Sequence, residues 1–418
     1  MKIIFLAFVL ALTKVLSKWA APIEVTSFVD PTRINPAMFT DSSSGITYVA
    51  YCNSTSGFAY FAYLDNSGLF LTGPEILNDK LRCYRLDISG PHDGQHVFIT
   101  MEARRSLSLD DCTKENNYET CDDIFVFESE DAGQSWLPPR NIGGVPGDQH
   151  IRRSFTVLTN WNTHYFWIIY NRYENGASNI ATSRYDTKNR VFNEEKILVE
   201  KYGEMNYYPL ITIDESGKTK LVVFYTTPYS LSLQTIVSLD DGVTWNKGAK
   251  VNKPSQDEKM VYKAIKSKGK YIMAGLGKGS VINFAFSEDL GKTWSELKRA
   301  PGNDLEEVQF CSTENPNGPD AGLVVLHSVE KKFKMSYSPI PLEEYKNAYV
   351  PDMLYYVGVR LFMNCYYVGK ELKMRFMYQI RSPHQGASMY RLYIIDNDDL
   401  VTTPADEVKE VAGHKEDL

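Results

Sequence analysis

Short apolar segments, some of them alternating with polar residues, recur along most of this chain. Four clear examples lie at residues 124–127, 165–170, 221–225 and 323–326. Alternation with a period of two puts successive side chains on opposite faces of an extended strand. Segments this short favour strands over helices. The pattern predicts an all-β protein made of many short strands.

The apolar segment at the start of the chain is different. Met1 and Lys2 precede an unbroken apolar run over residues 3–12, and small residues follow around Ser17. These features are typical of a secretory signal peptide, so we expect residues 1–17 to be one, with cleavage after Ser17. The alternative is an N-terminal core helix. No later stretch approaches the ~18 apolar residues of a membrane span, and we expect no transmembrane segment.

A turn motif of the form S-x-D-x-G-x-[ST]-W occurs three times. Its fixed positions are Ser129, Asp131, Gly133 and Trp136 in the first copy, Ser238, Asp240, Gly242 and Trp245 in the second, and Ser287, Asp289, Gly291 and Trp294 in the third. In a hairpin turn the Asp carboxylate accepts backbone N–H groups, the Gly supplies a positive φ, and hydroxyl groups add local hydrogen bonds. The Trp packs beneath the turn. We therefore expect these residues to be structural and not catalytic.

The spacing of the motif indicates the length of a repeating structural unit. Asp240 and Asp289 lie 49 residues apart, whereas Asp131 and Asp240 lie 109 apart, which is about two units. Weaker candidate turns lie at residues 62–68, 183–186, 336–338 and 396–398. Units of roughly 50 residues with four strands each are typical of β-propellers. No linker rich in Pro, Gly or Ser divides the chain, so we expect one domain over residues 18–404, followed by an acidic tail over 405–418.

The repeated motif resembles the Asp box, or BNR repeat, of the sialidase (neuraminidase) superfamily. Three near-complete copies make this a specific match. The resemblance implies a β-propeller of four-stranded blades, which in sialidases number six. Seven candidate turns leave open a seventh blade or an N-terminal addition over residues 23–80.

Composition and charge exclude several classes of protein. Of 418 residues, 45 are Lys or Arg and 52 are Asp or Glu, which gives a net charge of −7. Hydrophobic residues make up 43%, which excludes a disordered or collagen-like chain. The 27 Tyr and 20 Phe against 12 Met favour strands. A mildly acidic chain lacks the clustered Lys and Arg of nucleic-acid binders, so we expect no nucleic-acid partner.

The expected secretion of the protein favours disulfide bonds as the state of its six cysteines. An even set that enters an oxidising compartment predicts disulfides, and the expected pairs are Cys52–Cys83, Cys112–Cys121 and Cys311–Cys365. No pair has zinc-finger spacing and no HExxH motif occurs, so we expect neither a metal nor a cofactor. Residues 53–55 form a glycosylation sequon with Asn53 as the acceptor.

The chain ends Lys415-Glu416-Asp417-Leu418. This KEDL ending resembles the Lys-Asp-Glu-Leu class of retrieval signals, with the two acids exchanged. The alternative is a solvated acidic tail. Together with the signal peptide, the ending leaves two expected locations, the cell exterior and the lumen of the endoplasmic reticulum.

The sialidase resemblance extends to the first part of a substrate site. Residues 83–88 stand where the family has F/Y-R-I-P, with Asp87 in place of the Pro, and the following Arg and Asp residues keep the family order. The resemblance makes Arg85 the first carboxylate-binding Arg. It also assigns a sugar-contacting role to Arg104 or Arg105, and the acid/base role to Asp110 or Asp111. Arg suits a sugar carboxylate because its guanidinium donates to both oxygens and stays charged. The alternative for the three Arg is an ordinary salt-bridge role.

The second part of the site departs from the family pattern. Glu258 stands where the family keeps the Glu partner of its nucleophilic Tyr, although a solvated charge cluster is the alternative. Tyr366 or Tyr367 neighbours the nucleophile position, which Met363 occupies. The segments expected to carry the second and third Arg contain Lys but no Arg. Lys attracts a carboxylate but cannot donate two parallel hydrogen bonds to it. Arg360 and Arg375 are the candidate replacements.

Three functions stay open on these residues. The incomplete Arg set favours a sialidase-like propeller that recognises sialylated glycans or a glycoprotein partner in the secretory pathway. The intact first part of the site supports an active exo-alpha-sialidase or trans-sialidase, a retaining glycoside hydrolase. The KEDL ending supports a protein-interaction factor of the endoplasmic reticulum lumen. The sequence leaves the oligomeric state open.

Overall fold

A computed structural model describes most of the strands of this protein and many of its turns. The described residues are 23–29, 36–53, 55–65, 69–105, 122–143, 150–174, 177–201, 206–213, 218–227, 230–248, 261–267, 270–277, 281–289, 293, 295–296, 298–299, 308–312, 322–329, 332–339, 346–348, 361–368, 371–381 and 390–397. From residue 261 onward the description is mainly of the backbone. The described residues form 28 strands and no helix, which confirms the predicted all-β class.

These strands form six antiparallel sheets in the part of the chain that is described. The longest sheet contains, in spatial order, β2 (Ala37–Thr40), β3 (Thr47–Cys52), β4 (Phe58–Leu64), β5 (Phe70–Ser89), β6 (Val97–Arg105), β7 (Asp122–Ser129) and β8 (Arg140–Asn141). The next sheet contains β12 (Val191–Phe192), β11 (Ala177–Asp186), β10 (Tyr165–Glu174) and β9 (Ile151–Asn160), with β13 (Lys196–Lys201) also paired to β11.

The other four sheets have four strands each. The first contains β14 (Asn206–Ile213), β15 (Thr219–Thr227), β16 (Ser230–Ser238) and β17 (Asn246–Lys247). The second contains β18 (Val261–Ser267), β19 (Lys270–Gly277), β20 (Val281–Ser287) and β21 (Lys298–Arg299). The third contains β22 (Val308–Ser312), β23 (Gly322–Val329), β24 (Lys332–Pro339) and β25 (Lys346–Ala348). The fourth contains β26 (Leu361–Val368), β27 (Glu371–Arg381), β28 (Tyr390–Asn397) and the N-terminal strand β1 (Ile23–Val29).

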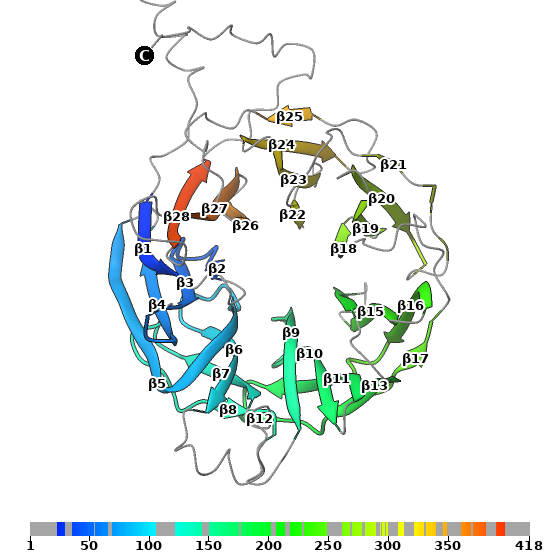
Figure 1. Cartoon of the computed structure of the whole chain (residues 1–418), viewed down its shortest axis with the longest axis horizontal. Helices are drawn as coiled ribbons and strands as arrows, with labels where there is room; N and C mark the ends of the chain where they lie inside the picture. The colour runs from blue at the N-terminus through cyan, green and yellow to red at the C-terminus, as the bar shows by residue number, and fades with distance from the viewer. Residues whose placement is uncertain are drawn as a thin grey trace, which may run out of the picture.

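The sheets follow one another around a common centre (Figure 1). Neighbouring sheets touch mainly through their first strands, because β14 contacts both β9 and β18, and β22 contacts both β18 and β26. β26 also contacts β2, so the sheet that holds both β1 and β28 lies beside the longest sheet. The four segments predicted as strands lie within β7, β10, β15 and β23. Residues 183–186 and 336–338 were wrongly predicted as turns, because they belong to β11 and β24 and pair with β10 and β23.

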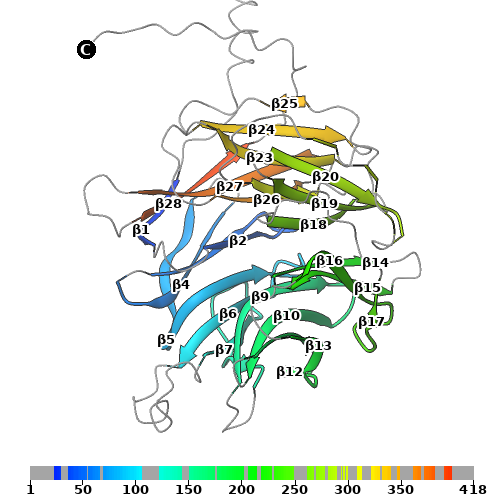
Figure 2. The ribbon, with the colours of Figure 1, turned by 45° about the vertical axis from the view of Figure 1, so that its right-hand side comes forward.

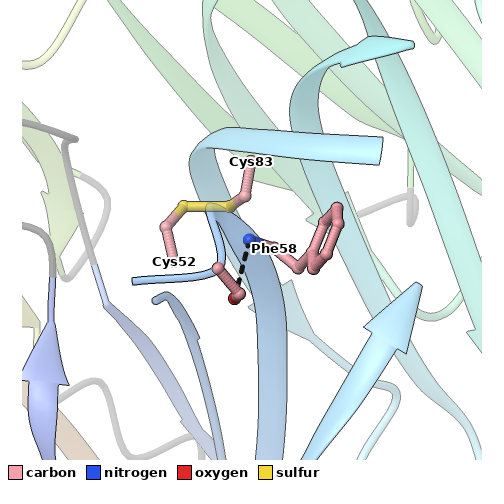
Figure 3. Close-up of a disulfide and its surroundings, with 4 residues drawn as sticks. Cys52, Phe58 and Cys83 are labelled. Carbon is pink, nitrogen blue, oxygen red and sulfur yellow. Dashed lines mark hydrogen bonds between the residues drawn. A yellow bond between two sulfur atoms is a disulfide. The ribbon is translucent and has the colours of Figure 1, made fainter. Parts of the chain in front are cut away.

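Strand β5 changes its partner along its length. Its first part pairs with β4 from Phe70 to Arg82, and its second part pairs with β6 from Leu81 to Ser89. The strand is therefore the last member of the set β2–β5 and the first member of the set β5–β8. The Cys52–Cys83 disulfide joins the end of β3 to this crossover, with Phe58 beside it (Figure 3). This bond confirms one predicted cysteine pair.

Apolar clusters fill the space between neighbouring sheets. Trp167 and Ile169 of β10 pack with Leu221 and Val223 of β15 in one such cluster. Burial of apolar surface of this kind is the main favourable contribution to folding. Among the described residues no helix could cross a membrane. In the same part of the chain no three His, Cys, Asp or Glu side chains are grouped so that they could hold a metal ion.

Each motif turn follows the third strand of a four-stranded set: β7 in β5–β8, β16 in β14–β17 and β20 in β18–β21. In the second turn, Asp240 Oδ1 accepts the Thr244 backbone N–H at 2.8 Å, and Asp240 Oδ2 accepts the Thr244 hydroxyl at 2.6 Å. Ser238 Oγ accepts the Gly242 N–H at 2.8 Å. The first turn repeats these bonds with Asp131, and the third repeats the carboxylate bonds with Asp289. Gly291 and Trp294 lie outside the described residues.

Candidate functional site: a charged cluster opposite the motif turns

A charged cluster lies at the end of the sheets opposite the motif turns. Strand β7 runs from Asp122, which is in the cluster, to Ser129, where the first motif turn begins. The cluster is built from the second part of β5, the end of β6, the start of β7 and the start of β9. Register explains how these residues come to share one face. Arg85 pairs with Glu102, and Arg104 pairs with Asp122. Cross-strand partners, and residues two apart on one strand, lie on the same face of a sheet.

Arg85 is half-buried in this cluster, and its guanidinium carbon lies 5.5 Å from the centre of the Phe155 ring. Its positive charge lowers the pKa values of Asp87 and Glu102, against the effect of burial. No described residue accepts a hydrogen bond from its guanidinium. Arg85 is thus held by a ring face and by long-range charge, and its N–H groups stay unused by the described part of the chain.

Asp122 joins two other arginines. Its side chain is 2% exposed, whereas those of Arg104 and Arg153 are 29% and 32% exposed. Arg104 donates to both carboxylate oxygens, at 2.7 and 3.2 Å, and Arg153 Nε donates to Oδ2 at 2.9 Å. One buried carboxylate therefore positions two partly exposed guanidinium groups.

A second ion network lies beside the first. Arg152 donates to Glu195 Oε1 at 2.9 Å and lies 3.4 Å from Asp123 Oδ1. Glu195 also accepts the Tyr170 hydroxyl at 2.5 Å and pairs with Arg172 at 3.1 Å. Arg152 is 4% exposed, so this network is a buried support of the cluster and not a surface for a ligand.

A backbone irregularity directs β9 toward Glu102. The pairing of β9 with β10 shifts register between Ile169 and Asn171, opposite Ser154, which has a φ of 56°. A bulge of this kind redirects the chain locally and is common beside functional sites. Here it allows the Ser154 N–H to donate to Glu102 Oε2 at 2.8 Å. Burial still raises the pKa of Glu102 above its ordinary value, because it outweighs this hydrogen bond and the nearby Arg85.

Two further half-buried groups line the cluster. Burial raises the pKa of Asp87 to about 6, although Arg85 and the backbone N–H groups of Ile88 and Val157 act against that rise. Burial also raises the pKa of Tyr207, and its hydroxyl donates to the Ile169 carbonyl at 3.1 Å. Because nucleophilic Tyr requires a hydroxyl that ionises more easily, Tyr207 is not an activated nucleophile.

The residues expected from the sequence have different positions in this structure. Arg85 and Arg104 lie together in the cluster, whereas the side chain of Arg105 lies outside the described residues. Also outside the described residues are Asp110, Asp111, Glu258, Cys112 and Cys121, and the side chains of Tyr366, Cys311 and Cys365. Cys311 and Cys365 lie on the neighbouring strands β22 and β26. Their pairing and the Cys112–Cys121 bond stay predictions.

Two other expected residues are in described parts of the chain. Arg375 is buried on β27 and donates to Thr47 Oγ1, so it joins two sheets and is not a replacement ligand of the cluster. Asn53 is 8% exposed, and its Oδ1 accepts the backbone N–H groups of Thr55 and Ser56. Glycosylation of Asn53 stays a prediction.

Sequence reasoning missed several members of the cluster, namely Glu102, Asp122, Arg153, Phe155 and Tyr207. Signals existed for some of them. Glu102 is an acid that follows a mainly apolar run in its strand, the dipeptide Asp122-Asp123 begins β7, and Arg152-Arg153 follows the first residue of β9. Buried charges in strands are rare unless they are paired, so these were candidates for one network.

Comparison with known proteins gives matches at the level of the fold. No protein-family model and no curated protein matches this chain. The polysaccharide lyase Uly1 superposes with a TM-score of 0.55 and 8% identity, over 91% of this chain and 100% of its own. A mutant of the NanB sialidase from Streptococcus pneumoniae superposes with a TM-score of 0.51 and 9% identity, over 91% of this chain and 93% of its own. The chain has a sialidase-like fold. At such low identities this likeness concerns the fold alone, and function depends on the residues of the site.

Proposed function

We propose that this protein is a sialidase-like propeller that recognises sialylated glycans, free or on a glycoprotein partner, without hydrolysing them. One observation carries the proposal: Arg85 is half-buried and donates no hydrogen bond within the described part of the chain. A guanidinium in this position favours a carboxylate ligand, because it can donate two parallel hydrogen bonds to it. The exposed sides of Arg104 and Arg153 add positive charge nearby.

The arrangement of the sheets supports a propeller as the scaffold. Neighbouring sheets touch in chain order, and the N-terminal strand completes the sheet of the C-terminal strands. Because β5 belongs to two four-stranded sets, we assign seven four-stranded units to this propeller, one more than sialidases have. The charged cluster then lies where the strands of one such unit face the first strand of the next.

Departures of the sequence from the family pattern favour recognition over hydrolysis, because Met363 occupies the nucleophile position and only Lys stands where the second and third Arg are expected. A retaining sialidase needs an activated Tyr nucleophile. Tyr207 of the cluster does not fit this role, because burial raises its pKa and a backbone carbonyl accepts its hydroxyl, whereas the side chain of the candidate Tyr366 lies outside the described residues. Active exo-alpha-sialidase is the second candidate function, and the order of Arg85, Arg104, Asp110 and Asp111 along the chain favours it.

Binding of sialyllactose and lactose, measured by isothermal titration calorimetry, tests the proposal. We expect the protein to bind sialyllactose and not lactose, since only the former carries a carboxylate. Arg85→Met should weaken binding about tenfold or more, the effect of losing a charge-assisted hydrogen bond. Arg140→Met is the matched control, because it removes an exposed Arg from β8 and should leave binding unchanged. Equal binding of the two sugars, or equal affinity in both variants, would contradict the proposal.

Incubation with a fluorogenic sialoside at acidic and neutral pH separates the two candidates. Absence of turnover together with sialyllactose binding supports recognition. Turnover that Asp110→Ala and Arg85→Ala abolish would instead establish the sialidase.

We also propose that the protein works in the secretory pathway. The Cys52–Cys83 disulfide supports this location, because such bonds persist in oxidising compartments. Expression of the full chain, and of a variant without its last four residues, tests whether the protein is released or is an endoplasmic reticulum factor. Release of only the shortened chain would support the endoplasmic reticulum.

A further inference from the structure

A cavity of about 230 Å³ lies near the second motif turn, at the end of the sheets that is opposite the charged cluster. Its wall combines residues of β10, β11 and β13, the segment between β12 and β13, and the motif turn itself. The lining residues that matter here are Thr182, Arg184, Glu194, Lys196 and Val243. The sheet of β9–β13 and the sheet of β14–β17 lie side by side around this point (Figures 1 and 2).

The hollow exists because the outer strand of the sheet is divided. β12 pairs with the end of β11 at Tyr185 and Asp186, whereas β13 pairs with the earlier part of β11, up to Thr182. The segment between β12 and β13 makes one described backbone bond to β11, from the Asn193 N–H to the Arg184 carbonyl at 2.8 Å. Glu195 turns inward to Arg152, and Glu194 stays exposed at the cavity.

Two cationic side chains line the cavity and are positioned by the motif turn. Lys196 donates to the Val243 carbonyl, which is its one described contact. Arg184 stacks on the Tyr165 ring, with 4.2 Å from the guanidinium carbon to the ring centre, and lies 3.5 Å from the Asp241 carbonyl. A carbonyl fixes the position of an ammonium group without neutralising its charge. Lys196 therefore presents a positive charge to the cavity, and no described acid forms an ion pair with it.

A buried hydroxyl in the cavity wall lacks a partner. Thr182 is 3% exposed, and its Oγ1 makes no hydrogen bond to any described residue. Leaving a buried polar atom unsatisfied is unfavourable, and native structures rarely do so without a reason. A ligand hydroxyl in the cavity would satisfy Thr182, and the exposed Glu194 carboxylate is a second acceptor for hydroxyl groups.

We propose that this cavity is a second binding site, for a hydroxylated monoanion of monosaccharide size, that is, a sugar acid. The carboxylate of the ligand would lie against Lys196 and Arg184, and its hydroxyl groups against Thr182 and Glu194. The volume is below the roughly 300–1,000 Å³ of pockets for drug-sized ligands, which fits one sugar ring. The site lies away from the charged cluster and does not depend on the function proposed there.

Titration of the full-length protein with sodium D-glucuronate, followed by calorimetry, tests this site. We expect binding of glucuronate, and neither of D-glucose, which lacks the charge, nor of acetate, which lacks the hydroxyl groups. Lys196→Met should weaken glucuronate binding about tenfold or more. Thr182→Val should weaken it about fivefold while leaving Tm unchanged or raised, because the hydroxyl that it removes has no protein partner.

Ser178→Ala is the matched control. Ser178 lies on the same strand, and its buried hydroxyl also lacks a partner, but it does not line the cavity. This variant should bind glucuronate like the wild type. Absence of glucuronate binding, or the same affinity in Thr182→Val and Ser178→Ala, would overturn the proposal.

Two additions to the titration separate related possibilities. A trisaccharide that ends in glucuronate distinguishes the sources of the ligand: binding of both probes identifies the terminal residue of a glycan, and binding of glucuronate alone identifies a free sugar acid. Arg85→Met should not change glucuronate binding at this site. Loss of binding in that variant would place the ligand in the charged cluster and overturn the second site.

Discussion

At the scale of single residues, two pairs of adjacent charges organise the cluster. Asp122 accepts hydrogen bonds from Arg104 and Arg153. The next residue, Asp123, accepts hydrogen bonds from Arg152 and from the Asn141 side chain. Each dipeptide divides its charges between two networks, because successive residues of a strand point in opposite directions. Removing one partner of such a network leaves an uncompensated buried charge, which is why these residues act as sets.

The half-buried carboxyl of Asp87 predicts a specific pH dependence of stability. Its pKa is about 6 in the folded protein and 3.8 as the unperturbed value. Between pH 4 and 6 the folded state keeps a proton that the unfolded state loses, so this group lowers the free energy of unfolding as pH rises through that range. We expect Asp87→Asn to be more stable than the wild type at pH 7, by up to about 3 kcal/mol, and equally stable near pH 4.

Urea unfolding at pH 4 and pH 7 measures this difference. Asp79→Asn, at an exposed site on the same strand, is the control and should be neutral at both pH values. A stability difference between Asp87→Asn and wild type that is the same at both pH values would contradict the assignment.

At the scale of elements, the first and second motif turns are each pressed against an aromatic side chain of another strand. Gly133 and Gly242 have φ values of 86° and 76°. A Cβ on Gly133 would lie 2.7 Å from Phe61 Cζ, and one on Gly242 would lie 2.5 Å from Trp167 Nε1. Glycine is thus required twice over, by the left-handed backbone and by the close approach of a buried ring.

We therefore expect Gly133→Ala and Gly242→Ala each to lower the free energy of unfolding by about 1–3 kcal/mol, from backbone strain and overpacking together. Chemical denaturation measures the loss. Gly73→Ala on β5 is the matched control, because nothing lies within 4 Å of its added Cβ and it should be nearly neutral. The idea fails if Gly73→Ala costs as much as the two motif variants.

At the scale of the whole molecule, the two ends of the described chain meet in one sheet. β1 pairs antiparallel with β28, and Val25 of β1 is buried with Val49, Tyr51 and Met377. Those partners lie in two different sheets, so the N-terminal strand completes one sheet and also packs it against its neighbour. This contact lies at the point where the first and last sheets of the chain meet.

Val25→Asp should therefore destabilise the whole fold, by about 3 kcal/mol or more, because it places an unpaired charge in an apolar cluster. Thermal unfolding followed by circular dichroism measures the shift in Tm. Val191→Asp makes the same substitution on the exposed strand β12 and should shift Tm little. Equal shifts in the two variants would show that β1 contributes no more than an exposed strand.

The sequence by itself determined those features that depend on local chemistry. Strand periodicity at residues 165–170 and 221–225 predicted elements that the structure contains. The even number of cysteines predicted disulfides, and of the expected pairs the structure shows Cys52–Cys83. Local signals suffice there, because side-chain alternation and turn hydrogen bonds involve residues close in sequence.

Only the tertiary structure decided which charges meet. Arg104, Asp122 and Arg153 become one unit because β6, β7 and β9 bring their ends together. The division of β5 between two sets of strands, and of the outer strand between β12 and β13, likewise follows from pairing with distant segments. Register and sheet packing are long-range properties, and a shift of one residue would turn Arg85 and Glu102 to the other face of their sheet.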